Sequence, residues 1–157
     1  MFWQALLAFL AMPALVAFAI PAGWLWLHQE WQLAHPWGLP VCLTGVVGLL
    51  WCVRDFYVLG KGTLAPWAPP QKLVVRGLYR FSRNPMYVSV VLVLLGWAIS
   101  FGARALFGYA LIVATAFHFR VVWGEEPWLA STHGEQWAAY ARRVPRWFGR
   151  TRASRRG

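Results

Sequence analysis

Two groups of charged side chains in this chain each border a long apolar run. Three arginines fall within eight residues and directly precede an Asn-Pro pair: Arg76, Arg80 and Arg83, then Asn84-Pro85. Glu125 and Glu126 are adjacent, although the chain has only five acidic residues. Guanidinium groups donate hydrogen bonds to anions, whereas carboxylates accept them from ammonium and hydroxyl groups. The two groups are candidates for facing walls of one site. The simpler alternative is a helix end in water at Glu125-Glu126, paired with a nearby arginine.

Other kinds of catalytic site have little support in the sequence. No Ser, His and Asp arrangement for nucleophilic catalysis is visible, and the four histidines lack the spacing of metal ligands. We therefore expect no metal site. His118 lies in an apolar run, where a helix–helix hydrogen bond is a commoner role than catalysis. Cys42 and Cys52 are ten residues apart in one expected helix, which is about 15 Å of rise and excludes a disulfide.

The composition indicates an integral membrane protein. Of the 157 residues, 59% are hydrophobic, 17% are aromatic and only 13% are charged, and the mean hydropathy is +0.46. A soluble domain has about 25% charged residues. Apolar runs of the length that a spanning helix needs predict an all-α bundle of about four spanning helices, at about 5–27, 37–55, 85–101 and 104–123. We expect one domain over 1–149 and a basic disordered tail at 150–157.

The basic residues predict the orientation of these spans. Six Lys and Arg lie between positions 54 and 83 and seven between 142 and 156, whereas the loop between the first two spans has none. The positive-inside rule then places both termini, the long loop and the tail in the cytoplasm of a multi-pass protein. Few lysines among many arginines favours a bacterial inner membrane. The net charge is +10. Because the basic residues follow the ends of apolar segments, we expect the chain to contact membrane lipids and not nucleic acid.

The connections between the spans are expected to bring the polar residues together. Residues 71–75 read as a short extended piece, followed by a turn or short helix from Gly77 to Tyr79. Only a few residues join the third and fourth spans, so these must form a tight antiparallel hairpin. Its cytoplasmic ends carry Arg83 on one side and Glu125 on the other, and should therefore meet.

The segment after Glu126 is predicted to form an interfacial helix. Trp137, Tyr140 and Val144 are spaced as one stripe of such a helix. The arginines around them would meet anionic headgroups at the membrane surface.

Two separated motifs resemble those of the isoprenylcysteine carboxyl methyltransferase and phospholipid methyltransferase superfamily. The first is RGLYRFSRNPMY at 76–87, and the second is EEPWLASTHGEQWAAYARRVPRW at 125–147. The family pattern is roughly G-x-Y-x-x-x-R-H-P-x-Y, then E-E-x-x-L-x-x-x-x-G-x-x-[YW]-x-x-Y-x-x-x-V-P. Every position matches except the histidine, which is Asn84 here. The resemblance covers about residues 60–147.

The resemblance implies a membrane-embedded methyltransferase that uses S-adenosylmethionine and acts on a lipidic or hydrophobic acceptor. In such proteins the cofactor lies in a cytoplasmic pocket, here formed by loop 54–84 and the C-terminal segment, and the acceptor enters from the bilayer. Carried over position by position, the implied cofactor contacts are Gln71, Lys72, Leu73, Val74, Tyr79, Asn84, Pro85, Met86, Tyr87, Glu125 and Glu126.

These residue types suit methyl transfer. The reaction is an in-line displacement on a sulfonium whose leaving group needs no proton, so alignment and exclusion of water carry catalysis. No catalytic residue is assigned. Carboxylates can accept from the cofactor's ammonium and ribose hydroxyls, Lys72 can donate to its carboxylate, and the faces of Tyr79 and Tyr87 can attract the sulfonium. Without the resemblance, the tyrosines would be interpreted as anchors at the membrane interface.

Two positions depart from the family pattern. An amide at Asn84 cannot act as a base, which argues against an essential proton transfer there or indicates a different substrate. The carboxyl methyltransferases also carry a substrate-binding arginine just before the glutamates. Arg120 lies one residue before the position of that arginine, and one residue corresponds to about 100° of rotation around a helix. Arg120 is the candidate substrate contact and mildly favours a carboxylate acceptor; headgroup binding and snorkelling are the alternatives.

A non-enzymatic membrane scaffold or subunit that retains the fold is the alternative function. The matched glutamates and the R-N-P-x-Y segment count against it. A small transporter would place polar residues in the middle of several spans, where they are scarce.

Overall fold

The computed structural model describes residues 10–59 and 72–148. Gln71, one of the predicted cofactor contacts, and the tail predicted at 150–157 lie outside the described residues. Every regular element in the described ranges is a helix. The predicted all-α fold is therefore confirmed.

Four apolar helical segments correspond to the four predicted spans. They are η1 with α2 (Leu10–Ala19 and Ile20–His28), α3 (Gly38–Val58), α4 (Pro85–Phe101) and α5 (Arg104–Arg120). By length and composition, Gly38–Val58 and the continuous run Arg104–Arg143 are candidates to cross a membrane, while Pro13–His28 and Pro85–Phe101 are shorter apolar helices. Only 22% and 17% of the apolar windows in the two long helices are buried inside the protein. Most of their apolar side chains face outward, as in a helix surrounded by lipid.

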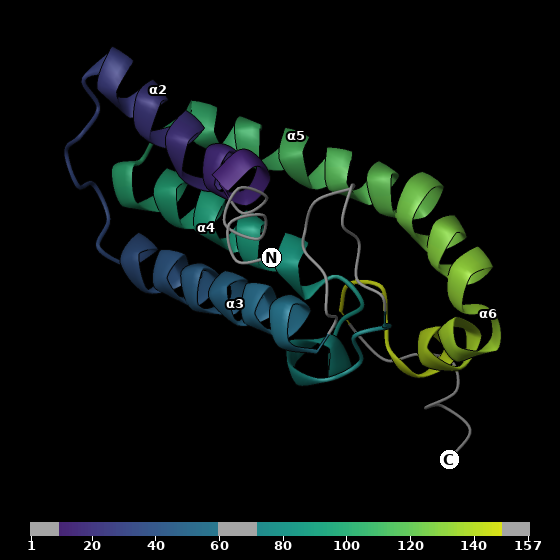
Figure 1. The fold of residues 1–157 in the computed structure, drawn as a ribbon. Helices are drawn as coiled ribbons and strands as arrows, with labels where there is room; N and C mark the ends of the chain where they lie inside the picture. Colours follow the sequence, from purple (N-terminus) through teal and green to yellow (C-terminus); the bar gives the residue numbers. More distant parts are fainter. Residues whose placement is uncertain (1–9, 60–71, 149–157) are drawn as a thin grey trace.

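Helix α4 lies at the centre of the bundle. Figure 1 shows α2, α3 and α5 beside it. Two clusters of buried residues form the core around α4. The larger one is Ala17, Leu49, Val90, Val93, Leu94, Ala110 and Val113, and the smaller one is Leu25, Ala98, Ala103 and Leu106. The contact between α3 and α4 is close because glycines face it. A Cβ at Gly45 would lie 2.6 Å from the backbone nitrogen of Val93. Small residues at such a contact let two helix backbones approach each other.

A tight turn joins α4 to α5. Helix α4 ends at Phe101, Gly102 follows in the left-handed conformation with a φ of 61°, and α5 begins at Arg104. Glycine adopts a positive φ without steric cost and commonly ends helices in this way. The predicted hairpin is therefore confirmed. Its opposite end has Pro85 in the first turn of α4 and Arg120 at the end of α5.

Helical structure continues beyond α5 through a π-helical turn. This turn, η3 (Val121–Glu125), leads directly into α6 (Glu126–Arg143). Figure 1 shows the chain bending away from the direction of α5 into α6. Within α6, Gly134 has a φ of 49° and a ψ of −120°, so the helix is kinked there. A π turn inserts an extra residue into a helix and is frequent at functional sites.

The non-helical residues 72–76 pack against α6. Residues 72–76 lead into η2, a 3-10 helix at Gly77–Arg80, as predicted for this stretch. Trp137, Tyr140 and Val144 are all buried and form one cluster against Leu73. Trp137 and Tyr140 therefore lie on one face of α6 as predicted, whereas Val144 follows the helix in an extended conformation, so the predicted helical stripe is one residue too long. The cluster joins α6 to the segment before η2.

Candidate functional site

A small pocket lies where the polar ends of α4 and α5 meet. Its lining comes from four parts of the chain: Phe56; Lys72, Leu73 and Val74; Tyr79, Arg83, Asn84, Met86 and Tyr87; and Glu125, Leu129, His133, Trp137 and Tyr140. The cavity measures about 90 Å³. We refer to it as the polar pocket. It lies between the loop and the C-terminal segment that were predicted to form the cofactor site.

Glu125 forms one wall of the polar pocket with two hydrogen-bonded partners. The Tyr87 hydroxyl donates to Glu125 Oε1. Arg120 Nε donates to the Tyr87 hydroxyl at 3.1 Å and to Glu125 Oε1 at 3.0 Å. In a regular α-helix, residues five apart lie on different sides. The π turn η3 changes this spacing and brings Arg120 and Glu125 together. The π turn adds one residue between Arg120 and the glutamates. This addition matches the position of Arg120, which is one residue earlier than the arginine of the family pattern.

Glu126 points into a separate cluster of charges. Arg83 Nη1 donates to Glu126 Oε1 at 2.9 Å, and Arg146 donates from Nε to Oε1 at 2.8 Å and from Nη2 to Oε2 at 2.7 Å. The side chains of Arg83 and Glu126 are only 14% and 16% exposed, so these bonds are little screened by solvent. We refer to Arg83, Glu126 and Arg146 as the ion clamp. It ties the start of α4 to the start of α6 and to the residues after α6.

The environment of the ion clamp shifts the pKa values of both of its arginines. Burial lowers the pKa of Arg83, and the neighbouring Glu126 acts in the opposite direction. Hydrogen bonding to Glu126 raises the pKa of Arg146. Guanidinium groups lose no proton under ordinary conditions, so the clamp keeps two positive charges around one carboxylate.

Residues 145–148, the C-terminal strap, are held to the start of α4 by further hydrogen bonds. The Arg83 N–H donates to the Pro145 carbonyl at 2.9 Å. The Arg146 carbonyl accepts from Asn84 Nδ2 at 3.0 Å and from Ser82 Oγ at 3.2 Å. Asn84 thus serves as an N–H donor to the backbone, a role that needs no titratable group.

Tyr79 and Tyr140 form the aromatic side of the polar pocket. The Tyr140 hydroxyl donates to the Tyr79 carbonyl at 2.7 Å, and the Tyr79 ring meets Phe56 edge to face at 5.5 Å. Burial raises the pKa of both phenols, so both stay neutral. Arg83 Cζ lies 5.6 Å from the centre of the Trp137 ring, within the range of a cation–π contact.

Most, but not all, of the predicted cofactor contacts meet in the polar pocket. Those that line it are Lys72, Leu73, Val74, Tyr79, Asn84, Met86, Tyr87 and Glu125. Among the described residues, Pro85 and Glu126 are outside the lining, because Pro85 is buried at the start of α4 and Glu126 belongs to the ion clamp. Arg120 reaches the pocket wall through Tyr87 and Glu125.

Six residues that line the polar pocket were not among the predicted cofactor contacts, although Arg83 was expected beside the site: Phe56, Arg83, Leu129, His133, Trp137 and Tyr140. Four of them are fixed positions of the two motifs, namely Arg83, Leu129, Trp137 and Tyr140, so the motifs contained the signal. Phe56 and His133 carry no such mark, because only the packing of α3 and α6 brings them to the pocket.

The groups around the polar pocket fit S-adenosylmethionine, the cofactor implied by the motifs. Glu125 offers oxygens that accept from ammonium and hydroxyl groups. Arg83 Nε is buried and has no hydrogen-bond partner among the described residues, which makes it a donor for an anion. The aromatic faces suit a cation. The volume is below the roughly 300–1,000 Å³ of ligand pockets, so binding requires the pocket to widen.

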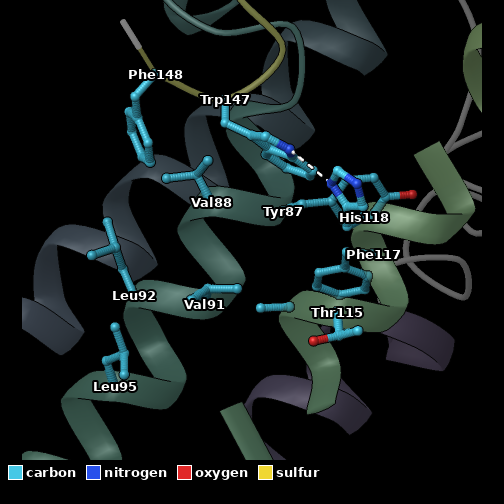
Figure 2. Close-up of a pocket in the computed structure, with 11 residues that line it drawn as sticks. Tyr87, Val88, Val91, Leu92, Leu95, Thr115, Phe117, His118, Trp147 and Phe148 are labelled. Carbon is cyan, nitrogen blue, oxygen red and sulfur yellow. Dashed lines mark hydrogen bonds between the residues drawn. The ribbon is translucent and has the colours of Figure 1, made fainter. Parts of the chain in front are cut away.

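A second and larger cavity lies on the other side of Tyr87. It measures about 580 Å³ and runs between α4 and α5 (Figure 2). Its lining is Tyr87, Val88, Val91, Leu92 and Leu95 from α4, Ala114, Thr115, Phe117 and His118 from α5, and Trp147 and Phe148 from the strap. We refer to it as the apolar groove. Tyr87 lines both cavities, and its ring lies 4.3 Å from that of Phe117.

The fold thus combines apolar helices, two of them long and apolar enough to cross a membrane, with two cavities that share Tyr87. The chain belongs to the phospholipid methyltransferase family, whose model matches residues 34–136. It is therefore a membrane-integral protein of a methyltransferase family. No solved structure matches the chain.

The chain is also similar to a curated protein, in a match that covers about four fifths of this chain. The cobalt-zinc-cadmium resistance protein CzcN of Cupriavidus metallidurans is 30% identical over 131 residues, which cover 78% of this chain and 55% of that protein. The chain thus spans about half the length of this relative. Within residues 10–59 and 72–148, no group of three or more His, Cys, Asp or Glu could hold a metal ion.

Proposed function

We propose that this protein transfers a methyl group from S-adenosylmethionine to a lipidic or hydrophobic acceptor, with a carboxylate as the favoured accepting group. The observation that carries the proposal is the position of Tyr87, whose side chain lines both the polar pocket and the apolar groove. A polar site and an apolar site that share one wall allow a water-soluble and a membrane-soluble reactant to meet in a fixed orientation. Family membership supports the same reaction class.

The polar pocket is the cofactor side of this proposal. S-adenosylmethionine supplies a methyl group on a positively charged sulfur. Glu125 accepts hydrogen bonds from ammonium or hydroxyl groups, and Arg83 Nε, which has no partner in the described part of the chain, donates to a carboxylate. Tyr79 and Trp137 present aromatic faces to positive charge. Leu73, Val74 and Met86 complete the apolar part of the lining.

The apolar groove is the acceptor side. Its walls are largely apolar, and a site that keeps water out favours a displacement between charged partners. Arg120 stands beside Tyr87 with 48% of its side chain exposed, and its hydrogen bonds to the described residues use only Nε. Its remaining guanidinium N–H groups can bind an acidic head group. An ionised carboxylate attacks without losing a proton, so this reaction needs no base and agrees with an amide at Asn84.

The proposed setting is a bacterial inner membrane that the chain crosses several times, with both termini in the cytoplasm. The outward-facing apolar helices and the charge distribution support it. The polar pocket, the ion clamp and the strap would then lie at the cytoplasmic surface.

Calorimetric titration of S-adenosylhomocysteine into detergent-purified protein tests the cofactor side. We expect micromolar binding that Glu125→Ala weakens at least about tenfold, because hydrogen bonds to a charged group are lost. Glu135→Ala removes an exposed carboxylate from α6, the helix that follows Glu125, and should leave binding unchanged. Transfer of radiolabelled methyl groups to long-chain carboxylic acids then tests the acceptor side.

The absence of binding by a folded protein, with and without added lipid, would reject the proposal. It would favour a non-enzymatic membrane scaffold or subunit with the same fold. If Glu125→Ala and Glu135→Ala lost the same amount of S-adenosylhomocysteine affinity, only the role of Glu125 would be rejected.

A further inference from the structure

One end of the apolar groove is polar, and the C-terminal strap forms it. Figure 2 shows Trp147 and His118 facing each other beside Tyr87, while Leu92 and Leu95 line the groove further along α4. Trp147 Nε1 donates a hydrogen bond to His118 Nδ1 at 3.3 Å. The groove is therefore amphipathic along its length.

The position of Trp147 is set by the residues directly before it. The Arg83 N–H binds the Pro145 carbonyl, and Asn84 Nδ2 binds the Arg146 carbonyl. The Arg146 side chain is bound twice by Glu126. A residue that follows two such anchored positions has little freedom, so the contact between Trp147 and His118 is built into the fold.

The hydrogen bond from Trp147 selects one form of the His118 ring. A neutral imidazole has one N–H donor and one acceptor nitrogen. Because Nδ1 accepts from Trp147, the proton of the neutral ring is on Nε2. Among the described residues, no hydrogen bond engages His118 Nε2. The groove therefore ends at a donor that has no hydrogen-bond partner in residues 10–59 and 72–148.

We propose that His118 and Trp147 form the head-group end of the acceptor site, where His118 Nε2–H donates to an oxygen of the acceptor. This inference rests on the proposed function and names its substrate class. The α4 wall from Val88 to Leu95 covers two helical turns, about 10 Å, along a single pair of helices. That shape holds one hydrocarbon chain. The acceptor is then a single-chain amphiphile with an oxygen-bearing head group, such as a long-chain carboxylic acid.

Photo-cross-linking tests this assignment without cofactor or turnover. The probes are a diazirine-bearing long-chain carboxylic acid and a hydrocarbon of the same chain that ends in a methyl group. Labelled sites are mapped by mass spectrometry, and half-saturation is measured for each probe in detergent. His118→Leu removes the donor, whereas His118→Gln keeps an N–H group near the position of Nε2. Trp147→Phe keeps an aromatic ring and removes only its N–H.

We expect both probes to label the groove around Val91 and Leu92. His118→Leu should raise the half-saturating concentration of the acid about tenfold and leave that of the hydrocarbon unchanged. The half-saturating concentration of the acid for His118→Gln should stay close to that of the wild type. The value for Trp147→Phe should lie between those of the wild type and His118→Leu. Thermal unfolding of each variant checks that it is folded.

Three results would overturn the inference: an equal loss for both probes in His118→Leu, no loss for the acid, or labelling outside the groove. The first would make His118 a packing residue. Calorimetry with S-adenosylhomocysteine on the same samples separates this inference from the proposed function. Head-group-dependent labelling in a protein that binds no cofactor would reject the methyltransferase and leave an amphiphile site.

Discussion

The polar pocket and the apolar groove share Tyr87 but are built in opposite ways. The groove lies between α4 and α5, which are neighbours in sequence and joined by a two-residue turn at Gly102 and Ala103. The pocket depends on segments far apart, since Arg83 and Glu126 are separated by 43 positions. The α4–α5 hairpin supplies most of the groove wall, to which the strap adds Trp147 and Phe148, whereas the pocket exists only after several distant segments have docked.

The C-terminal strap is the part that belongs to both regions. Arg146 joins the ion clamp beside the pocket, and Trp147, the next residue, reaches the groove. Damage to the clamp should therefore affect both regions, while changes in the α3–α4 contact or in the groove wall should affect mainly one. This difference can be tested by substitution.

Glu126→Ala should have the largest effect. It leaves Arg83 buried without its carboxylate and releases Arg146, and the loss of one partner from a buried ion pair costs several kcal/mol. Because the pair is 14% and 16% exposed, we expect about 3 kcal/mol less stability. Thermal unfolding in detergent measures this loss. Cofactor binding and labelling by the acid probe should both weaken.

Arg146→Ala is the matched control for the clamp. Its side chain is 36% exposed, and Arg83 keeps its bond to Glu126 when Arg146 is removed. The expected cost is about 1 kcal/mol, as for a partly exposed pair. Equal destabilisation by the two variants would show that the clamp does not depend on the buried Arg83–Glu126 bond.

Gly45→Ala should separate α3 from α4 and disturb the pocket more than the groove. Its Cβ would lie 2.6 Å from the backbone nitrogen of Val93 and 2.7 Å from the Ser89 carbonyl oxygen, and overpacking of this kind costs about 2 kcal/mol. Helix α3 carries Phe56 to the pocket but contributes no residue to the groove lining. Calorimetry should therefore show weaker cofactor binding while probe labelling persists.

Gly108→Ala provides the control, because a Cβ at Gly108 meets nothing within 4 Å. Its higher helix propensity should leave stability equal or raised by up to about 1 kcal/mol. A similar loss in both glycine variants would mean that the α3–α4 contact is not the cause.

The same division explains how much could be predicted from sequence. Apolar runs and the short connection at Gly102 predict α4, α5 and their hairpin, because these depend on local patterns. The paired motifs predict Tyr79, Tyr87 and Glu125 at the pocket.

The remaining features depend on contacts that no local pattern encodes. The sequence gives no sign of the π turn at Val121–Glu125, which aligns Arg120 with Glu125. Nor does it separate the tasks of two adjacent glutamates, because η3 and the docking of Arg146 turn Glu126 away from the pocket. The role of His118 at the groove likewise depends on Trp147, 29 positions later.

Leu92→Trp should fill the groove and spare the pocket. Leu92 lines the groove wall on α4 and has no part in the pocket lining. A bulky ring there should raise the half-saturating concentration of both cross-linking probes about tenfold, corresponding to the roughly 1–3 kcal/mol cost of overpacking. Cofactor affinity should not change. A parallel loss of S-adenosylhomocysteine binding would mean that the two regions are coupled through Tyr87 rather than merely adjacent.

Asn84→His, which restores the family residue, should have the smallest effect. Asn84 donates to the Arg146 carbonyl at 3.0 Å, and a neutral histidine also offers one N–H donor. We expect stability within about 0.5 kcal/mol of the wild type, since one donor replaces another of similar strength. Asn84→Leu removes the donor and should cost about 1 kcal/mol. If Asn84→His instead raised methyl transfer strongly and made it depend on pH near neutrality, the position would act on a proton, and its role would extend beyond holding the strap against the start of α4.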